Sequence, residues 1–284
     1  MRKRIIAVAG LLVAASCAGP ALAAGDTAAG VKQAGLSAIG LTSDQRLVVF
    51  DVRRPAGVWS LGRVWGLSGD TRLVGIDFRV QNGKLYGVGD RGGIYTFSTR
   101  NAQAMKVSQL TVALSGTAFG VDFNPAANRL RVVSGSGQNL RHNMDDPAAP
   151  LATTVDATLT NPTTPPSTAI GVTGAAYTNN DLSTATATTL FDLDTMADRV
   201  SVQSPANTGT LAPAGSLGTD ADPDAGFDIY YDPATGTNQG YAVIKTTGTS
   251  RLYRVNLLNG KATDSGAFPK KFQVTDLALP INQR

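Results

Sequence analysis

Residues 220–228 hold four aspartates in close succession: Asp220, Asp222, Asp224 and Asp228. Carboxylates at such spacing can wrap a hard cation, because calcium takes several oxygen ligands. The helical calcium-binding loop has glycine at its sixth position and glutamate at its twelfth, whereas this segment has alanine and tyrosine there. The four aspartates are therefore the strongest local candidate for a calcium site, but because the match is partial we favour an acidic loop between blades that binds no metal.

Further aspartates recur in the pattern Gly-apolar-Asp-apolar, with a weaker copy near the end of the chain; they are Asp77, Asp122, Asp228 and Asp276. A buried carboxylate needs partners that offset its desolvation. In one hypothesis each accepts hydrogen bonds from backbone N–H groups of a neighbouring strand or turn and pins the structure. In the other, several converge on a central channel and bind a cation. The spacing alone does not decide between them.

Other catalytic chemistry has little support. His142 is the only histidine, it falls in a predicted strand, and the chain has no Gly-x-Ser-x-Gly turn. The only cysteine is Cys17. We therefore expect a structural histidine, no zinc or copper site and no cofactor, with calcium as the alternative.

Composition predicts the elements that position these residues. All 21 acidic residues are aspartates, and alanine, threonine and glycine are abundant. Because glutamate favours helices while Asp, Asn, Gly and Thr favour turns and strands, we expect almost no helix after the first residues. About 260 remaining residues suffice for one all-β domain.

Sets of four short strands repeat at intervals of about 45 to 55 residues, which is typical of a β-propeller. The set at 73–112 is the most complete, the next covers 118–159, and two more begin at Gly171 and Phe227. The end segment 272–279 resembles an opening strand without followers, and 39–65 resembles followers without an opener. We therefore predict five blades, with six as the alternative count, closed by pairing of the terminal strands.

Two smaller segments carry their own predictions. The segment 160–168, rich in proline and threonine, is expected to be a long loop between blades. Trp59 and Trp65 are expected to be buried between blades, with a sugar-stacking surface as the alternative.

Turns of a propeller alternate between two rims, and one rim here collects the more charged residues. We predict that it binds a ligand, through residues from the first two complete blades: Asp70, Arg72, Asp90, Arg91, Gln138 and Asn139. The Asp220–Asp224 loop, Lys270 and Lys271 fall on the same rim.

The first residues resemble a secretory signal peptide over 1–23, with a basic start, an apolar run of about 14 residues, and Ala21-Leu22-Ala23 as a cleavage site. We expect a flexible tether over 24–36 and the propeller over 37–284. The protein should be exported to the periplasm or the exterior, without a transmembrane segment. A lipid anchor on Cys17 is the alternative.

The charge of the chain limits the classes of partner that it can bind. Without the three basic leader residues the chain has 22 basic and 21 acidic residues. A near-neutral chain without a basic cluster is unlike a nucleic-acid-binding protein. We expect a monomer that binds a protein, a cell-surface component or a small molecule.

Several strings resemble a family of secreted bacterial proteins, domain of unknown function 4394. They include Gly75-Ile76-Asp77-Phe78-Arg79, Arg129-Leu130-Arg131-Val132-Val133-Ser134, Gln138-Asn139-Leu140-Arg141 and Tyr177-Thr178-Asn179-Asn180. Asn128 departs from the aspartate common before the arginine run, and Ser204-Pro205-Ala206-Asn207 from a more usual double proline. The resemblance covers most of the chain and implies a secreted all-β domain, but no activity.

We therefore expect a secreted, non-catalytic propeller that acts as a binding scaffold. The alternative is a calcium-dependent hydrolase of the lactonase or esterase kind, in which channel aspartates hold a metal that polarises a carbonyl. Convergence of the aspartates within reach of one cation would distinguish the two.

Overall fold

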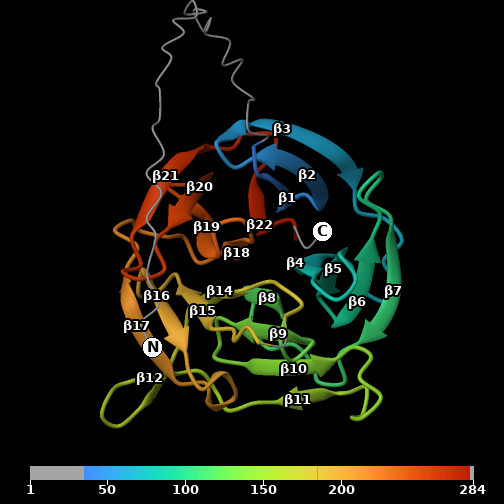
Figure 1. Cartoon of the computed structure of the whole chain (residues 1–284). Helices are drawn as coiled ribbons and strands as arrows, with labels where there is room; N and C mark the ends of the chain where they lie inside the picture. The colour runs from blue at the N-terminus through green and yellow to red at the C-terminus, as the bar shows by residue number, and fades with distance from the viewer. Residues whose placement is uncertain (1–34, 184, 282–284) are drawn as a thin grey trace, which may run out of the picture. The chain divides into compact units, whose positions relative to one another are not determined.

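The computed structural model describes residues 35–183 and 185–281. The predicted signal peptide, Cys17 and nearly all of the predicted tether lie outside this range. The compact unit begins at Gly35. Five four-stranded sheets surround a common centre (Figure 1), and the described part holds no helix besides a single 3₁₀ turn at Ala206–Thr208. No helix of this part is long and apolar enough to cross a membrane.

Each sheet is one antiparallel blade, and its strands follow one another from the centre outward. Blade 1 consists of β22 (Val274–Ala278), β1 (Ser37–Thr42), β2 (Arg46–Asp51) and β3 (Arg54–Arg63). Blade 2 consists of β4 (Leu73–Arg79), β5 (Lys84–Gly89), β6 (Gly93–Phe97) and β7 (Ala104–Gln109). Blade 3 consists of β8 (Phe119–Asn124), β9 (Arg129–Ser134), β10 (Asn139–Asn143) and β11 (Thr153–Val155).

Blade 4 consists of β14 (Val172–Tyr177), β15 (Leu190–Asp194), β16 (Arg199–Gln203) and β17 (Leu211–Ser216). Blade 5 consists of β18 (Ala225–Asp232), β19 (Thr237–Thr246), β20 (Thr249–Val255) and β21 (Ala262–Ala267). In blade 1 the carboxyl-terminal strand β22 pairs with β1, so that Ile39 faces Ala278 and Leu41 faces Asp276. The predicted five blades and the closure by terminal strands are thus confirmed.

Two of the smaller predictions were wrong. The segment 160–168 is not a plain loop, because it contains a short hairpin of β12 (Thr160–Asn161) and β13 (Ser167–Thr168). Trp59 and Trp65 are 73% and 51% exposed. Trp59 belongs to β3, which is the outermost strand of its blade and has no further strand to cover it.

The glycine of the repeated pattern explains how the inner strands pack. A Cβ added to Gly75 or Gly120 would lie 2.5 Å from an atom of the next inner strand, and one on Gly174 would lie 2.7 Å from Phe227. Real Cβ atoms do not approach so closely, so these positions require glycine. After Gly75 and Gly120 the close approach brings the aspartate two residues later within reach of the neighbouring strand, whereas Gly174 is followed by Ala176 at that position.

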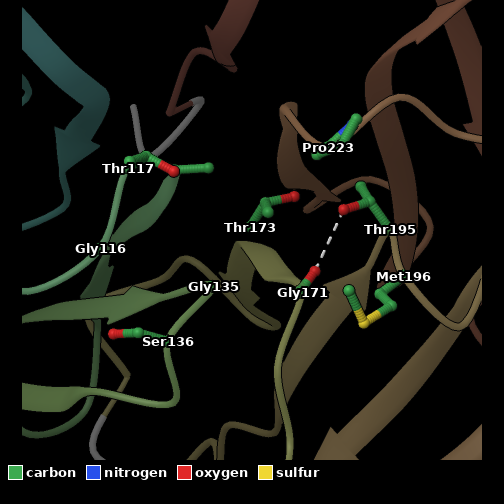
Figure 2. Close-up of a pocket in the computed structure, with 10 residues that line it drawn as sticks. Gly116, Thr117, Gly135, Ser136, Gly171, Thr173, Thr195, Met196 and Pro223 are labelled. Carbon is green, nitrogen blue, oxygen red and sulfur yellow. Dashed lines mark hydrogen bonds between the residues drawn. The ribbon is translucent and has the colours of Figure 1, made fainter.

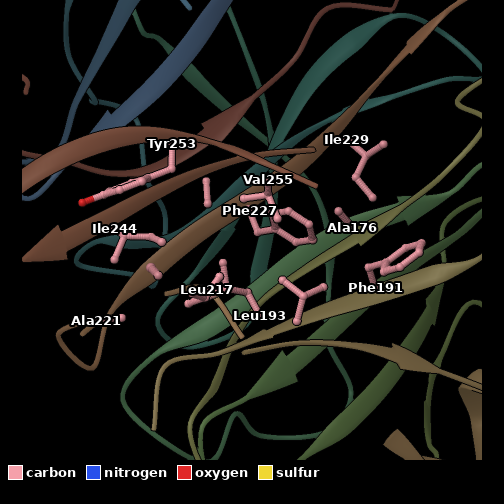
Figure 3. Close-up of a cluster of buried hydrophobic side chains, with 13 residues drawn as sticks. Ala176, Phe191, Leu193, Leu217, Ala221, Phe227, Ile229, Ile244, Tyr253 and Val255 are labelled. Atoms are coloured by element: carbon pink, nitrogen blue, oxygen red, sulfur yellow. The ribbon is translucent and has the colours of Figure 1, made fainter. Parts of the chain in front are cut away.

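Apolar side chains fill the five junctions between neighbouring blades as five buried clusters. Figure 3 shows the cluster between blades 4 and 5, where Phe191 and Leu193 of β15 pack with Phe227 and Ile229 of β18. Burial of apolar area at these junctions is the main force that holds the blades together.

Candidate functional site

Loops at the end of the ring where the inner strands begin enclose a cavity of about 410 Å³, which we call the rim pocket. Its walls come from the entries to β8 and β14, from the β9–β10 and β15–β16 turns, and from the loop before β18 (Figure 2). It is lined by Gly116, Thr117, Ala118, Gly135, Ser136, Gly171, Thr173, Thr195, Met196 and Pro223.

The lining of the rim pocket is neutral, since it consists of small, hydroxyl-bearing and apolar residues. Two hydroxyls are satisfied by backbone carbonyls: Thr195 Oγ1 donates to Gly171 O at 3.2 Å (Figure 2), and Ser136 Oγ donates to Ser115 O at 2.9 Å. Thr173 differs, because its Oγ1 is buried and has no hydrogen-bond partner. A buried polar atom without a partner is costly, so Thr173 Oγ1 would gain a hydrogen bond from any ligand atom or water that reached it.

A second, more polar cavity of about 110 Å³ adjoins the rim pocket through Thr117 and Ala118. It lies at the start of the inner strands, among Leu73, Phe119 and Thr275, and Arg72, Asp224 and Asp276 bring charge to its wall. We call it the channel mouth.

Three carboxylates converge in the channel between the inner strands. Asp77 of β4, Asp122 of β8 and Asp228 of β18 each offer an oxygen that lies within 4.8 Å of the other two. They are 4%, 1% and 2% exposed. We call these three residues the channel cluster.

Most carboxylates of the repeat also pin neighbouring blades. Asp77 Oδ2 accepts from the backbone N–H of Phe123 at 2.8 Å, Asp228 Oδ2 from Leu279 at 2.6 Å, and Asp276 Oδ2 from Ile76 at 2.8 Å. Each bond crosses from one blade to the next, so the pinning hypothesis is confirmed for these three aspartates. Three of the four aspartates also converge in the channel, as the other hypothesis requires, but cation binding by them stays a prediction.

Asp122 is the exception. The backbone N–H of Tyr177 on β14 faces its carboxylate, but it falls short of hydrogen-bond geometry, and both oxygens are buried without a partner. Burial raises the pKa of Asp122 well above its usual range, and the charges of Asp77 and Asp228 raise it further. Burial likewise raises the pKa of Asp77 well above its usual range and that of Asp228 to about 7.

One known protein family has a sequence profile that matches this chain. The sequence profile of a domain of unknown function, DUF4394, matches residues 46–278, which include every strand of the five blades except β1. The chain belongs to the DUF4394 family. No protein with a curated description matches it.

Solved structures similar to this DUF4394 domain share little sequence with it. An auxiliary nutrient binding protein from Bacteroides thetaiotaomicron has 11% identity and a TM-score of 0.46, over 86% of this chain and 64% of that one. The glutaminyl cyclase of Myxococcus xanthus has 15% identity and a TM-score of 0.42, over 77% of this chain and 80% of that one. A putative 6-phosphogluconolactonase from Bacteroides uniformis has 12% identity and a TM-score of 0.42, over 83% of each chain.

At such low sequence identities and TM-scores, the similarity to these structures says nothing about function. The DUF4394 chain also spans less than two thirds of two Bacteroides nutrient binding proteins, at 64% and 57% of their lengths.

Most residues predicted to form a ligand-binding rim lie in the loop before β4 and in the β5–β6 and β9–β10 turns of the DUF4394 domain, but most are engaged in hydrogen bonds within these loops. Asp90 accepts from the N–H and the hydroxyl of Thr71, and Asp70 accepts from the N–H of Arg91 and from Tyr95 Oη. These bonds tie the loop before β4 to the β5–β6 turn.

Gln138 and Asn139 are engaged as well. Gln138 accepts from Ser115 N–H and donates to Ala113 O, and Asn139 is buried at the junction of blades 3 and 4. The side chain of Arg72 is exposed and reaches the channel mouth. Ligand binding by this set stays a prediction, and Arg72 has the best position for it.

The predicted calcium loop is divided by the fold. Asp228 belongs to the channel cluster, whereas Asp224 lies at the channel mouth and Asp220 and Asp222 lie in the loop before β18. Among the described residues, the channel cluster is the one group of three or more metal-ligating side chains. Cation binding by the loop itself stays a prediction.

His142 is a buried, hydrogen-bonded histidine, as predicted. Its Nε2 lies 2.9 Å from Ser108 Oγ and its Nδ1 lies 3.0 Å from Thr153 Oγ1, and burial lowers its pKa. Sequence reasoning missed the rim pocket, whose residues belong to no motif. The only indication was the run of small residues in the loops 115–118 and 135–137.

Proposed function

We propose that this DUF4394 domain is an exported, non-catalytic binding module that holds a small neutral ligand in the rim pocket. The observation that carries the proposal is the unpartnered hydroxyl of Thr173 at the wall of a cavity of about 410 Å³. That volume is within the usual range for small-ligand sites, about 300 to 1,000 Å³. The basic and apolar start of the sequence supports export.

The lining indicates the chemistry of the ligand. No charged side chain contributes to the rim pocket, so an ion would lose its hydration there without compensation. Met196, Pro223 and Ala118 suit an apolar body, and Thr173 suits one hydroxyl or carbonyl group. We therefore propose a neutral, partly apolar ligand with one such group directed at Thr173.

Filling the pocket tests this proposal. Gly135 lines it with a φ outside the left-handed region, and a Cβ there meets nothing closer than 3.8 Å. Gly135→Leu should therefore fold while its side chain occupies the pocket. We expect neutral compounds with a hydroxyl or carbonyl group, lactones and esters included, to raise the Tm of the natural chain, and this shift to vanish in Gly135→Leu.

The control is Gly57→Leu on β3, where an added Cβ meets only Arg54 O at 3.4 Å; it should keep the shift. Thr173→Val should keep or slightly raise stability, because it removes an unpartnered hydroxyl, and should weaken binding up to about tenfold, because it removes one hydrogen bond to the ligand. If no compound shifts the natural chain, or if Gly135→Leu responds equally, the rim pocket is not the binding site.

The lactonase alternative receives one supporting observation, since the channel cluster lies within reach of one cation. A metal that polarises a carbonyl must contact it, and the cluster lies beneath the channel mouth with almost no exposure. The binding module is therefore preferred. Release of acid from the lactones and esters of the same panel would reverse this preference.

A further inference from the structure

The channel cluster has no role in the proposed binding of a neutral ligand. We propose that Asp77, Asp122 and Asp228 bind one divalent cation, calcium in preference to magnesium, in the central channel. The inference rests on the distances between their oxygens, on the unpartnered state of Asp122, on the lack of a basic partner, and on a polar access route. It does not depend on the rim pocket.

The distances suit calcium. Calcium holds oxygen ligands at about 2.3 to 2.6 Å, so two oxygens can share one ion up to about 5 Å apart. The three oxygens of the cluster lie within 4.8 Å of one another. Magnesium demands near-octahedral geometry and gives up its waters reluctantly, so a buried group of three carboxylates suits calcium better.

The hydrogen bonds of the cluster leave acceptor capacity free. Each carboxylate oxygen of Asp77 and Asp228 accepts one backbone N–H. In each residue one oxygen accepts from the next residue in the chain, Phe78 or Ile229, and the other oxygen forms the bond to the neighbouring blade. A carboxylate oxygen has two lone pairs, so each keeps one. Asp122 keeps all of its acceptor capacity, because neither oxygen has a partner. A buried carboxylate in this state either holds a proton or receives a ligand, and two further carboxylates stand beside Asp122.

No basic side chain compensates the charge. Among the described residues, none of the ion pairs includes a member of the channel cluster. The charges that act on Asp77 and Asp122 are those of other aspartates, including Asp276. Three carboxylates in a small buried volume must either hold protons or share a cation.

A cation can approach along a polar route. Asp276 lines the channel mouth and interacts electrostatically with Asp228 below it and with Asp224 at the mouth. The carboxylates thus extend from the solvent-facing cavity to the cluster.

The test measures calcium binding by the purified, chelator-treated chain and by three variants. We expect one calcium per chain in equilibrium dialysis, and a Tm increase of about 5 to 10 °C at calcium a hundredfold above its Kd. Asp122→Asn keeps the size of the side chain and loses no hydrogen bond, so it should fold in chelator but show neither effect. Asp122→Ala, which reproduces Ala176 at the corresponding position of β14, is the second variant.

The matched control is Asp192→Asn. Asp192 on β15 is likewise a buried aspartate without a hydrogen-bond partner, but it lies outside the channel cluster. This variant should keep the full calcium increment. The proposal is overturned if the natural chain binds no calcium, magnesium or manganese, which would mean that the carboxyls share protons. It is also overturned if calcium binding survives in both Asp122 variants.

Discussion

Replacement of Arg131 by methionine is expected to lower the free energy of unfolding by about 3 to 5 kcal/mol, because it breaks a buried ion pair on one side. Arg131 is 1% exposed. Its guanidinium donates to Asp156 Oδ2 at 2.7 Å, to Asn139 Oδ1 at 2.6 Å and to Asn207 Oδ1 at 2.9 Å. Methionine fills much of the volume but leaves these oxygens without their donor.

The position of Arg131 makes this loss affect the whole ring. It lies at the junction of blades 3 and 4, where its Nε also donates to Tyr177 Oη on β14. The apolar cluster of this junction has fewer members than the other four, as far as the described residues go. Polar bonds therefore carry a larger share of the contact between these two blades than elsewhere.

Arg141 provides the matched control for this prediction. Its Nε donates to the same Asp156 Oδ2 at 2.6 Å, but its side chain is 32% exposed. A partly exposed pair contributes about 1 kcal/mol or less, so Arg141→Met should cost much less than Arg131→Met. Urea unfolding at neutral pH measures both. Equal losses would contradict the role assigned to the buried guanidinium.

Stability is expected to fall as the pH rises from about 5 to 8 in the presence of chelator. Burial raises the pKa of Asp192 to about 8, although the charge of Arg131 opposes the rise. Asp194 adds to it. In the unfolded chain Asp192 ionises near its usual pKa of about 4, so between these values the folded state holds a proton that the unfolded state has lost.

The sign follows from this difference. The contribution of Asp192 is fully present below about pH 4, and it is lost as the pH rises towards 8, at a rate on the order of 1 kcal/mol per pH unit. The channel cluster acts in the same direction. Asp145 acts oppositely, because the hydrogen bond from Arg79 lowers its pKa, and its contribution disappears at acid pH. We therefore expect the greatest stability near pH 4 to 5.

Urea midpoints at pH 5, 6, 7 and 8 check this prediction. Asp192→Asn should flatten the slope, because the amide is neutral at every pH. Arg131→Met should steepen it, because Arg131 is the basic group that acts on Asp192. A midpoint that rises from pH 5 to 8 in the natural chain would show that these carboxyls are ionised in the folded state.

Repetition made the architecture predictable from the sequence. The Gly-apolar-Asp-apolar copies located the inner strands, because the glycine is required where one inner strand meets the next. The pairing of β22 with β1 followed from an opening strand without followers at one end and followers without an opener at the other. The exposure of Trp59 was not predictable from the alternation of side chains along its strand, because this alternation does not tell whether another sheet covers the outermost strand.

The candidate sites were less predictable. The repeat identified Asp77, Asp122 and Asp228 as a set, but sequence spacing does not tell whether side chains of different blades point to the same place. Thr173 and Gly135 have no special chemistry in the sequence, and they form a pocket only because three blades bring their loops together. Asp220 and Asp222 were predicted as ligands from local spacing, whereas the fold sends Asp228 alone into the channel.

Closure of blade 1 by β22 has a consequence for the time at which the ring can form. Ile39 pairs with Ala278, so a ribosome-bound chain cannot complete its first blade until residues 274–278 have been synthesised. Pairings so distant in sequence form slowly. Two pins between blades, from Asp228 to Leu279 and from Asp276 to Ile76, depend on the same part of the chain. The channel therefore acquires its complete acidic lining only when the ring closes.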